Sequence, residues 1–100
     1  MDALRMVVDR DMTVYHALEL KHSLLDALLR AAALEVDLSQ VREIDTAGIQ
    51  LLMLAKRESQ KQGKSLAIIA HSPAVREALD FYNLAAFFGD PLVIPARDQQ

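Results

Sequence analysis

The chain has 100 residues, of which 52% are apolar, so a single domain over residues 1–100 can bury a core without a metal or a disulfide. It has no cysteine, which excludes a disulfide framework, thiol catalysis and cysteine-ligated metal centres and fits a reducing compartment. A formal net charge of −3, scattered Lys and Arg and only 5% aromatic residues provide neither a basic stripe nor a stacking platform, so nucleic acid is not an expected partner.

The first part of the chain predicts two strands, a helix and a further strand. Residues 4–8 and 12–15 have the pattern of short strands joined by a polar turn. Residues 16–32 predict an amphipathic helix whose apolar arc holds Leu18, Leu20, Leu24, Leu25, Leu28 and Leu29. Residues 34–38 alternate strictly between apolar and acidic side chains, which predicts a strand with one face in water and helices mainly on the other face of the sheet.

The second part predicts two helices and two strands. A helix over residues 47–62 is expected to stop at Gly63 in a left-handed conformation, and a helix over residues 74–82 is expected to begin after the capping pair Ser72-Pro73. The apolar run at residues 66–70 predicts a central strand, and residues 91–95, with a proline at each end, predict an edge strand. The expected fold class is α/β in the order β-β-α-β-α-β-α-β, with a mixed, mostly parallel sheet of four to five strands.

No pattern in the sequence predicts catalysis, a metal or a cofactor. His16 and His22 lie about 120° apart on a helical wheel, and His71 stands alone before a proline, so none of the three histidines has ligand spacing. The Ser72-Pro73 pair accounts for Ser72 as a helix cap, and no nucleophile elbow surrounds this serine. With three glycines in the chain there is no phosphate-binding glycine loop.

Residues 41–49 are the segment of greatest interest, because they end a strand and open a helix. The first N–H groups of a helix lack intrahelical partners and favour an anion, so a phosphate on the Thr46 hydroxyl would be well placed. The alternative is that Asp45 or Thr46 only caps the helix and contributes about 1 kcal/mol. Gly48 weakens a first helical turn, which suggests that another backbone or a ligand approaches it closely.

The helix that follows offers a candidate contact face. Leu54 projects among polar neighbours that include Gln50, and we expect it to be at least partly exposed. A single exposed leucine is common in soluble proteins, so its position beside Thr46 is what makes it a candidate contact.

Two segments resemble the STAS family. Residues 37–52 are similar to the signature D-L-S-x-V-x-x-I-D-[ST]-[SAG]-G-L, and residues 71–84 are similar to the family's S-P-A-V helix. Residues 10–13 depart from the G-x-L-D that usually precedes the first helix, which places the contacts of that loop in doubt. Ala47 replaces the second serine of D-S-S-G, so Thr46 is the one acceptor within the motif.

The resemblance implies a STAS fold and the role of a non-enzymatic, cytoplasmic anti-sigma factor antagonist. In that family the hydroxyl residue after the aspartate, here Thr46, is phosphorylated by a kinase-type anti-sigma factor, and a phosphatase is a further expected partner. The unphosphorylated form binds the kinase, and the contact residues would be Asp45, Thr46, Ala47, Gly48, Gln50 and Leu54.

The resemblance leaves two other roles open. D-T-A-G is also similar to the STAS subunit of phospholipid-trafficking ABC transporters, which binds an ATPase, and a regulator linked to two-component or chemotaxis systems is the third role. No insertion into a membrane is expected in any of the three roles, because no apolar run approaches the roughly 20 residues that a span requires.

Overall fold

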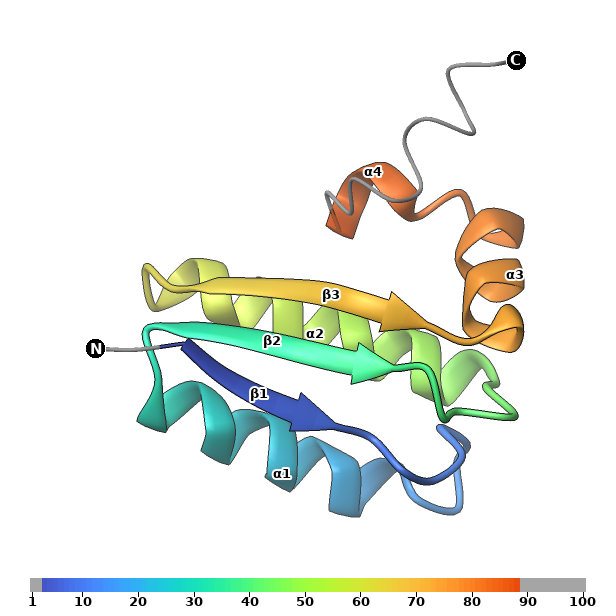
Figure 1. The fold of residues 1–100 in the computed structure, drawn as a ribbon, viewed down its shortest axis with the longest axis horizontal. Helices are drawn as coiled ribbons and strands as arrows, with labels where there is room; N and C mark the ends of the chain where they lie inside the picture. Colours follow the sequence, from blue (N-terminus) through green and yellow to red (C-terminus); the bar gives the residue numbers. More distant parts are fainter. Residues whose placement is uncertain (1–2, 89–100) are drawn as a thin grey trace.

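A parallel sheet forms the frame of the protein. The computed structural model describes residues 3–88, and its strands are β1 (Ala3–Val7), β2 (Ala33–Leu38) and β3 (Ser65–His71). They pair in the order β1-β2-β3, and both pairings are parallel. All three strands therefore end at the same edge of the sheet (Figure 1). The predicted α/β class with a mostly parallel sheet is confirmed, and the strand expected at residues 91–95 lies outside the described residues.

The strand predicted at residues 12–15 is wrong except at its first residue. Met12 makes one parallel bridge with Ile44, through hydrogen bonds to the residues on either side of it: Met12 N donates to Glu43 O at 2.9 Å, and Asp45 N donates to Met12 O at 3.2 Å. Directly afterwards His16 N donates to Thr13 O at 2.9 Å, which closes a turn that leads into the first helix. The chain turns here because the amides of Val14 and His16 donate to the Asp45 carboxylate and to Thr13 O rather than to a neighbouring strand.

Helices α1 (Ala17–Arg30) and α2 (Thr46–Lys61) cover one face of the sheet. Along β2, Leu34, Val36 and Leu38 are buried, whereas the residues between them are only partly buried. On the uncovered face of the sheet, Arg5 of β1 lies 4.0 Å from Glu35 of β2. The alternation in residues 34–38 therefore marked the covered face correctly.

Two leucines of α1 depart from the predicted apolar arc. Leu20, Leu24 and Leu28 are buried as expected, but Leu18 is 67% exposed and Leu29 is 69% exposed. The sheet has only three strands in the described residues, and α2 occupies the other half of its covered face. A broad apolar arc on α1 therefore exceeds the surface available to bury it, and its margins remain in water.

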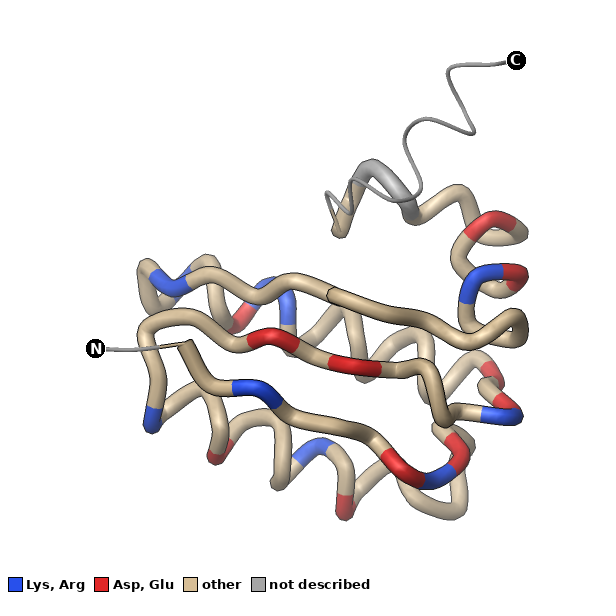
Figure 2. Tube along the Cα trace, viewed as in Figure 1, with Lys and Arg blue, Asp and Glu red and all other residues tan. Residues whose placement is uncertain are grey.

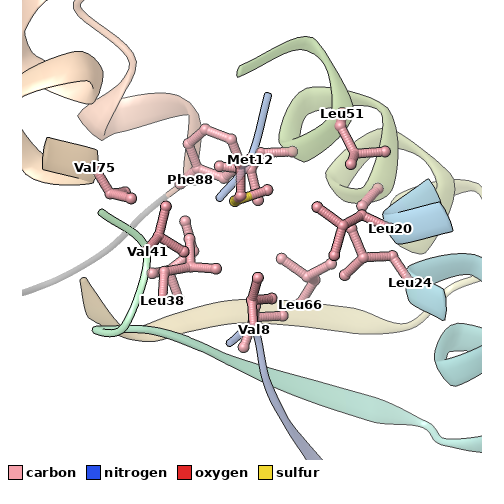
Figure 3. Close-up of a cluster of buried hydrophobic side chains, with 14 of the residues drawn as sticks. Val8, Met12, Leu20, Leu24, Leu38, Val41, Leu51, Leu66, Val75 and Phe88 are labelled. Carbon is pink, nitrogen blue, oxygen red and sulfur yellow. The ribbon is translucent and has the colours of Figure 1, made fainter. Parts of the chain in front are cut away.

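The core lies between the covered face of the sheet and the helices (Figure 3). Helix α3 (Pro73–Phe81) contributes Val75 and Leu79, which are fully buried. The short helix α4 (Ala85–Phe88) contributes Phe88, which is 3% exposed. Met12 is also fully buried in this core, so the segment between β1 and α1 is anchored by an apolar side chain although it forms no strand.

The helix boundaries follow the signals expected from the sequence. Gly63 has a φ of 69°, and the bonds from Gly63 N to Gln60 O (3.1 Å) and from Lys64 N to Ser59 O (2.8 Å) form a Schellman motif. The Ser72 hydroxyl accepts from Val75 N at 3.2 Å and caps α3. Both predicted caps are confirmed.

Strand β2 ends in a turn that is held by its last acidic residue. The Ser39 hydroxyl and the Ser39 amide donate to Asp37 Oδ1 at 2.6 and 2.9 Å. The hydroxyl bond, followed by the amide bond, lowers the pKa of Asp37 below its ordinary value. A depressed carboxyl pKa in the folded protein adds stability that is present above the unfolded pKa of about 3.9 and is lost as the pH falls through the folded pKa.

Replacing Ser39 with alanine should raise the pKa of Asp37 toward its ordinary value, because the largest cause of the lowering is removed. The measurement is an NMR titration of the Asp37 carboxyl carbon in the parent and in Ser39→Ala. Ser23→Ala, which changes an exposed serine of α1, should leave the titration unchanged. An identical Asp37 titration in the parent and in Ser39→Ala would contradict the assignment.

Candidate functional site

Asp45 joins the start of α2 to the loop before α1. It is the N-cap residue of α2, and its Oδ1 accepts from Gly48 N at 3.1 Å. Its Oδ2 accepts from Val14 N at 3.1 Å, and its own amide donates to Met12 O at 3.2 Å. The capping role that the sequence left open between two residues therefore belongs to Asp45, which also holds the loop.

Thr46 is the first residue of α2, and its side chain is exposed. The capping interaction is made by the preceding carboxylate, so the Thr46 hydroxyl is not used to cap the helix. Its Oγ1 atom lies 3.3 Å from the hydroxyl of Tyr82, which is the C-cap residue of α3. A phosphate on this oxygen would lie at the positive end of the α2 dipole, where negative charge is favoured.

Gly48, in the first turn of α2 below Thr46, is buried. A Cβ atom added to it would lie 2.1 Å from the carbonyl oxygen of Met12 and 2.8 Å from Cγ1 of Ile44. The close approach that the sequence suggested is therefore made by a backbone, that of Met12. Gly48 allows the loop to pack against the helix, and it shapes the candidate site from inside rather than presenting an atom to a partner.

The remaining predicted contact residues share a shallow apolar groove between α1 and α2. Leu54 is 38% exposed, as expected, and Gln50 is exposed as well. The groove has a volume of about 330 Å³, and its lining consists of Ala17, Leu18, Lys21, Ala47, Gln50, Leu51 and Leu54. Sequence reasoning did not identify Leu18 as a contact residue, because it placed Leu18 on the apolar arc of the first helix. The structure places Leu18 of α1 and Leu54 of α2 in the lining of the same groove, which lies on one side of Thr46.

The opposite flank of Thr46 carries aromatic residues that the sequence did not identify. Tyr15 is 90% exposed, Phe81 is 81% exposed and Tyr82 is 44% exposed. One signal was present, because Phe81 lies about 200° around α3 from the buried Leu79 and cannot share its face. Thr46 therefore lies between an apolar groove and an aromatic surface.

The charges around the site do not form a metal centre. Acidic and basic residues of residues 3–88 are spread over strands, helices and loops (Figure 2). Within this range, no group of three or more His, Cys, Asp or Glu side chains is arranged to hold a metal ion. Nor does any helix in that part of the chain have the length and apolar character to cross a membrane.

Asp45→Ala is expected to lower the free energy of unfolding by about 2 kcal/mol, because it removes the α2 cap and also the acceptor for the Val14 amide. Asp45→Asn keeps one carbonyl oxygen and should recover part of this loss. Urea denaturation of the three proteins measures both effects. An Asp45→Ala protein as stable as the parent would show that the carboxylate does not hold the loop.

Comparisons with known proteins agree on the fold. A family model described as "Mlab, STAS domain" matches residues 2–94. Among solved structures, the anti-sigma factor antagonist SpoIIAA in its unphosphorylated form is similar with a TM-score of 0.72 and 15% identity, over 98% of this chain and 87% of that one. The Bacillus cell fate determinant SpoIIAA in the phosphorylated form is similar with a TM-score of 0.66 and 14% identity, over 97% and 89%. No curated protein matches the chain.

Proposed function

Because the chain belongs to the STAS family, whose model matches residues 2–94, we propose that it is a non-enzymatic regulatory module that binds a partner protein at the start of α2. One observation carries the proposal. The Thr46 hydroxyl is exposed at the first position of α2, and the Asp45 carboxylate makes the capping bond in its place. This hydroxyl is therefore accessible to a modifying enzyme without any unfolding of the helix.

The proposed modification is a phosphoryl transfer to Thr46. The γ-phosphoryl group of a nucleoside triphosphate passes to Thr46 Oγ1, so that an O–P bond forms while the bond between the β–γ bridging oxygen and the γ-phosphorus breaks. The nucleoside diphosphate leaves, and a base of the kinase takes the hydroxyl proton. The chain supplies the acceptor oxygen only, and the catalytic groups belong to its partner.

The surface beside Thr46 supports a docking role for the unmodified form. Leu18 and Leu54 are exposed in the groove that Ala47 also lines, so apolar area that a partner can bury begins one residue from Thr46. A phosphate would add about −1.5 to −2 charges and a hydrated group next to Asp45. Phosphorylation would thus release the partner by repulsion and desolvation cost, with no change of fold.

The neighbours in structure support the proposed class of partner. SpoIIAA is an anti-sigma factor antagonist whose structure is known in both an unphosphorylated and a phosphorylated form. By analogy, the partner proposed for this chain is a kinase-type anti-sigma factor or a related serine/threonine kinase-like regulator. A phosphatase would return Thr46 to its binding form.

A second candidate function is that of the STAS subunit of a phospholipid-trafficking ABC transporter, which the Asp45–Gly48 segment also resembles. The observation that favours it is that the matching family model is described by the name Mlab rather than by SpoIIAA. In this case the same groove would bind the transporter ATPase constitutively, and Thr46 would remain unmodified.

Intact mass spectrometry separates the two candidates. After the co-purified partner and ATP are added, the switch predicts a gain of about 80 Da that fragmentation assigns to Thr46. Thr46→Ala should abolish the gain, and Thr13→Ala, which removes the other threonine of the chain, should not. An unmodified mass with a co-purified ABC ATPase would contradict the switch and support the transporter subunit.

A further inference from the structure

A second concave surface lies on the other flank of Thr46, between the turn at residues 13–15, residues 43–45 and α3. It is an open pocket of about 740 Å³, much larger than the groove that holds Leu54. Three aromatic rings line it, those of Tyr15, Phe81 and Tyr82. The function proposed above makes no use of this pocket.

The aromatic rings of the pocket are exposed to solvent. Tyr15 and Phe81 are the two most exposed large apolar side chains in the described residues, at 90% and 81%. Phe81 and Tyr82 make an edge-to-face pair with ring centroids 5.1 Å apart, so one ring braces the other. Phe81 and Tyr82 thus form a clustered exposed aromatic surface, and clustered rather than scattered exposed apolar side chains are a feature of interaction sites.

The charged residues of the pocket all have the same sign. Glu43, Asp45 and Glu77 line it, and none of its ten lining residues is Lys, Arg or His. Arg10, the basic residue of the loop that precedes Thr13, is paired with Asp9 and Glu19 and does not line the pocket. The lining of the pocket therefore combines aromatic faces with carboxylates and includes no cationic side chain.

We propose that this pocket binds an arginine side chain that a partner protein presents. A guanidinium group is planar and always charged, it stacks on aromatic faces and it forms forked hydrogen bonds to carboxylates. Rings from two elements and carboxylates from two elements supply both kinds of contact. Lysine suits the pocket less well, because its ammonium is a strongly hydrated point charge that cannot stack.

Thr46 couples the arginine pocket to the proposed switch. Tyr82 lines the pocket, and its hydroxyl lies 3.3 Å from Thr46 Oγ1. Negative charge placed on Thr46 therefore stands at the rim of the pocket and attracts a guanidinium group, whereas it repels a partner that docks in the groove between α1 and α2. A negative charge at Thr46 would therefore strengthen binding in the arginine pocket and weaken binding in the groove between α1 and α2.

The test uses two blocked tripeptides, Ac-Ala-Arg-Ala-NH2 and the same peptide with citrulline, which is a neutral near-isostere of arginine. Each is titrated into the ¹⁵N-labelled protein, and amide shifts are followed by NMR. The arginine peptide should give saturable shifts confined to residues around Tyr15, Glu77 and Tyr82, and the citrulline peptide should bind at least threefold more weakly. Equal shifts from the two peptides, or shifts that never saturate, would overturn the proposal.

Single substitutions then locate the site. Glu77→Gln and Phe81→Ala, both at exposed positions, should each weaken binding of the arginine peptide about threefold or more, whereas Leu54→Ala in the groove should not change it. Thr46→Glu should bind the peptide at least as tightly as the parent, and weaker binding would contradict the charge account. Because these readouts need no kinase, they can succeed or fail independently of phosphorylation at Thr46.

Discussion

Replacing Gly48 with alanine is expected to lower the free energy of unfolding by about 2–3 kcal/mol. The new Cβ atom would lie 2.1 Å from the carbonyl oxygen of Met12 and 2.9 Å from its Cβ atom. Met12 cannot yield easily, because its side chain is fully buried and its carbonyl oxygen accepts from Asp45 N. Helix propensity alone predicts the opposite, a gain of about 1 kcal/mol for alanine over glycine, so the sign of the effect is diagnostic.

Chemical denaturation of the parent, Gly48→Ala and Gly63→Ala measures the effect. Gly63 is the matched control, because a Cβ atom there meets nothing within 4 Å and the cost comes only from its φ of 69°. That cost is about 1–2 kcal/mol, so Gly63→Ala should lower the free energy of unfolding by no more than Gly48→Ala does. A Gly48→Ala protein more stable than the parent would mean that the loop does not pack against α2 as described.

The elements that the sequence predicted well are those with local signals. Helix α3 begins at Pro73 because Ser72 caps it, and α2 ends before Gly63 because glycine adopts the left-handed conformation readily. Both signals act over three or four residues, so a single sequence is sufficient to find them. The alternation in residues 34–38 similarly fixed which side of β2 faces the core.

The errors in the fold come from contacts between distant residues. Residues 12–15 have the composition of a strand, but Met12 bridges only to Ile44, and the amide of Val14 is taken by a carboxylate 31 positions away. The exposure of Leu18 was not predicted, because helical periodicity gives the direction of the apolar arc but not the width of the surface that covers it. Neither fact can be obtained from local pattern.

The candidate site was predicted in part for the same reason. The place of Asp45 and Thr46 at a strand-to-helix junction was visible in the sequence, and so was the need for space at Gly48. The neighbour of Thr46 across the chain, Tyr82, is 36 positions away and belongs to the end of α3. The aromatic flank therefore became apparent only when the fold brought α3 beside the start of α2.

Thr46→Glu is expected to weaken binding of the partner at least tenfold, which is about 1.4 kcal/mol. The new carboxylate lies beside Asp45 and at the edge of the apolar groove, where a docking partner would have to remove water from it. The variant should fold at least as well as the parent, because an acidic residue in the first turn of a helix is favoured by the helix dipole. The loss would therefore come from the interface and not from unfolding.

Two control variants isolate the cause. Thr46→Ala removes the hydroxyl without adding charge, and it should bind the partner within about twofold of the parent, since the capping bond is made by Asp45. Gln60→Glu adds the same charge at an exposed position near the far end of α2, and it should leave binding unchanged. Weakened binding by Gln60→Glu would assign the effect to net charge rather than to its place at Thr46.

The most direct test of a switch at Thr46 is a calorimetric titration of the co-purified partner into the parent, Thr46→Ala and Thr46→Glu. The predicted result is near-equal affinity for the parent and Thr46→Ala and an affinity at least tenfold lower for Thr46→Glu. Equal affinities for Thr46→Ala and Thr46→Glu would contradict the account, because they would show that negative charge at this exposed hydroxyl position does not control docking.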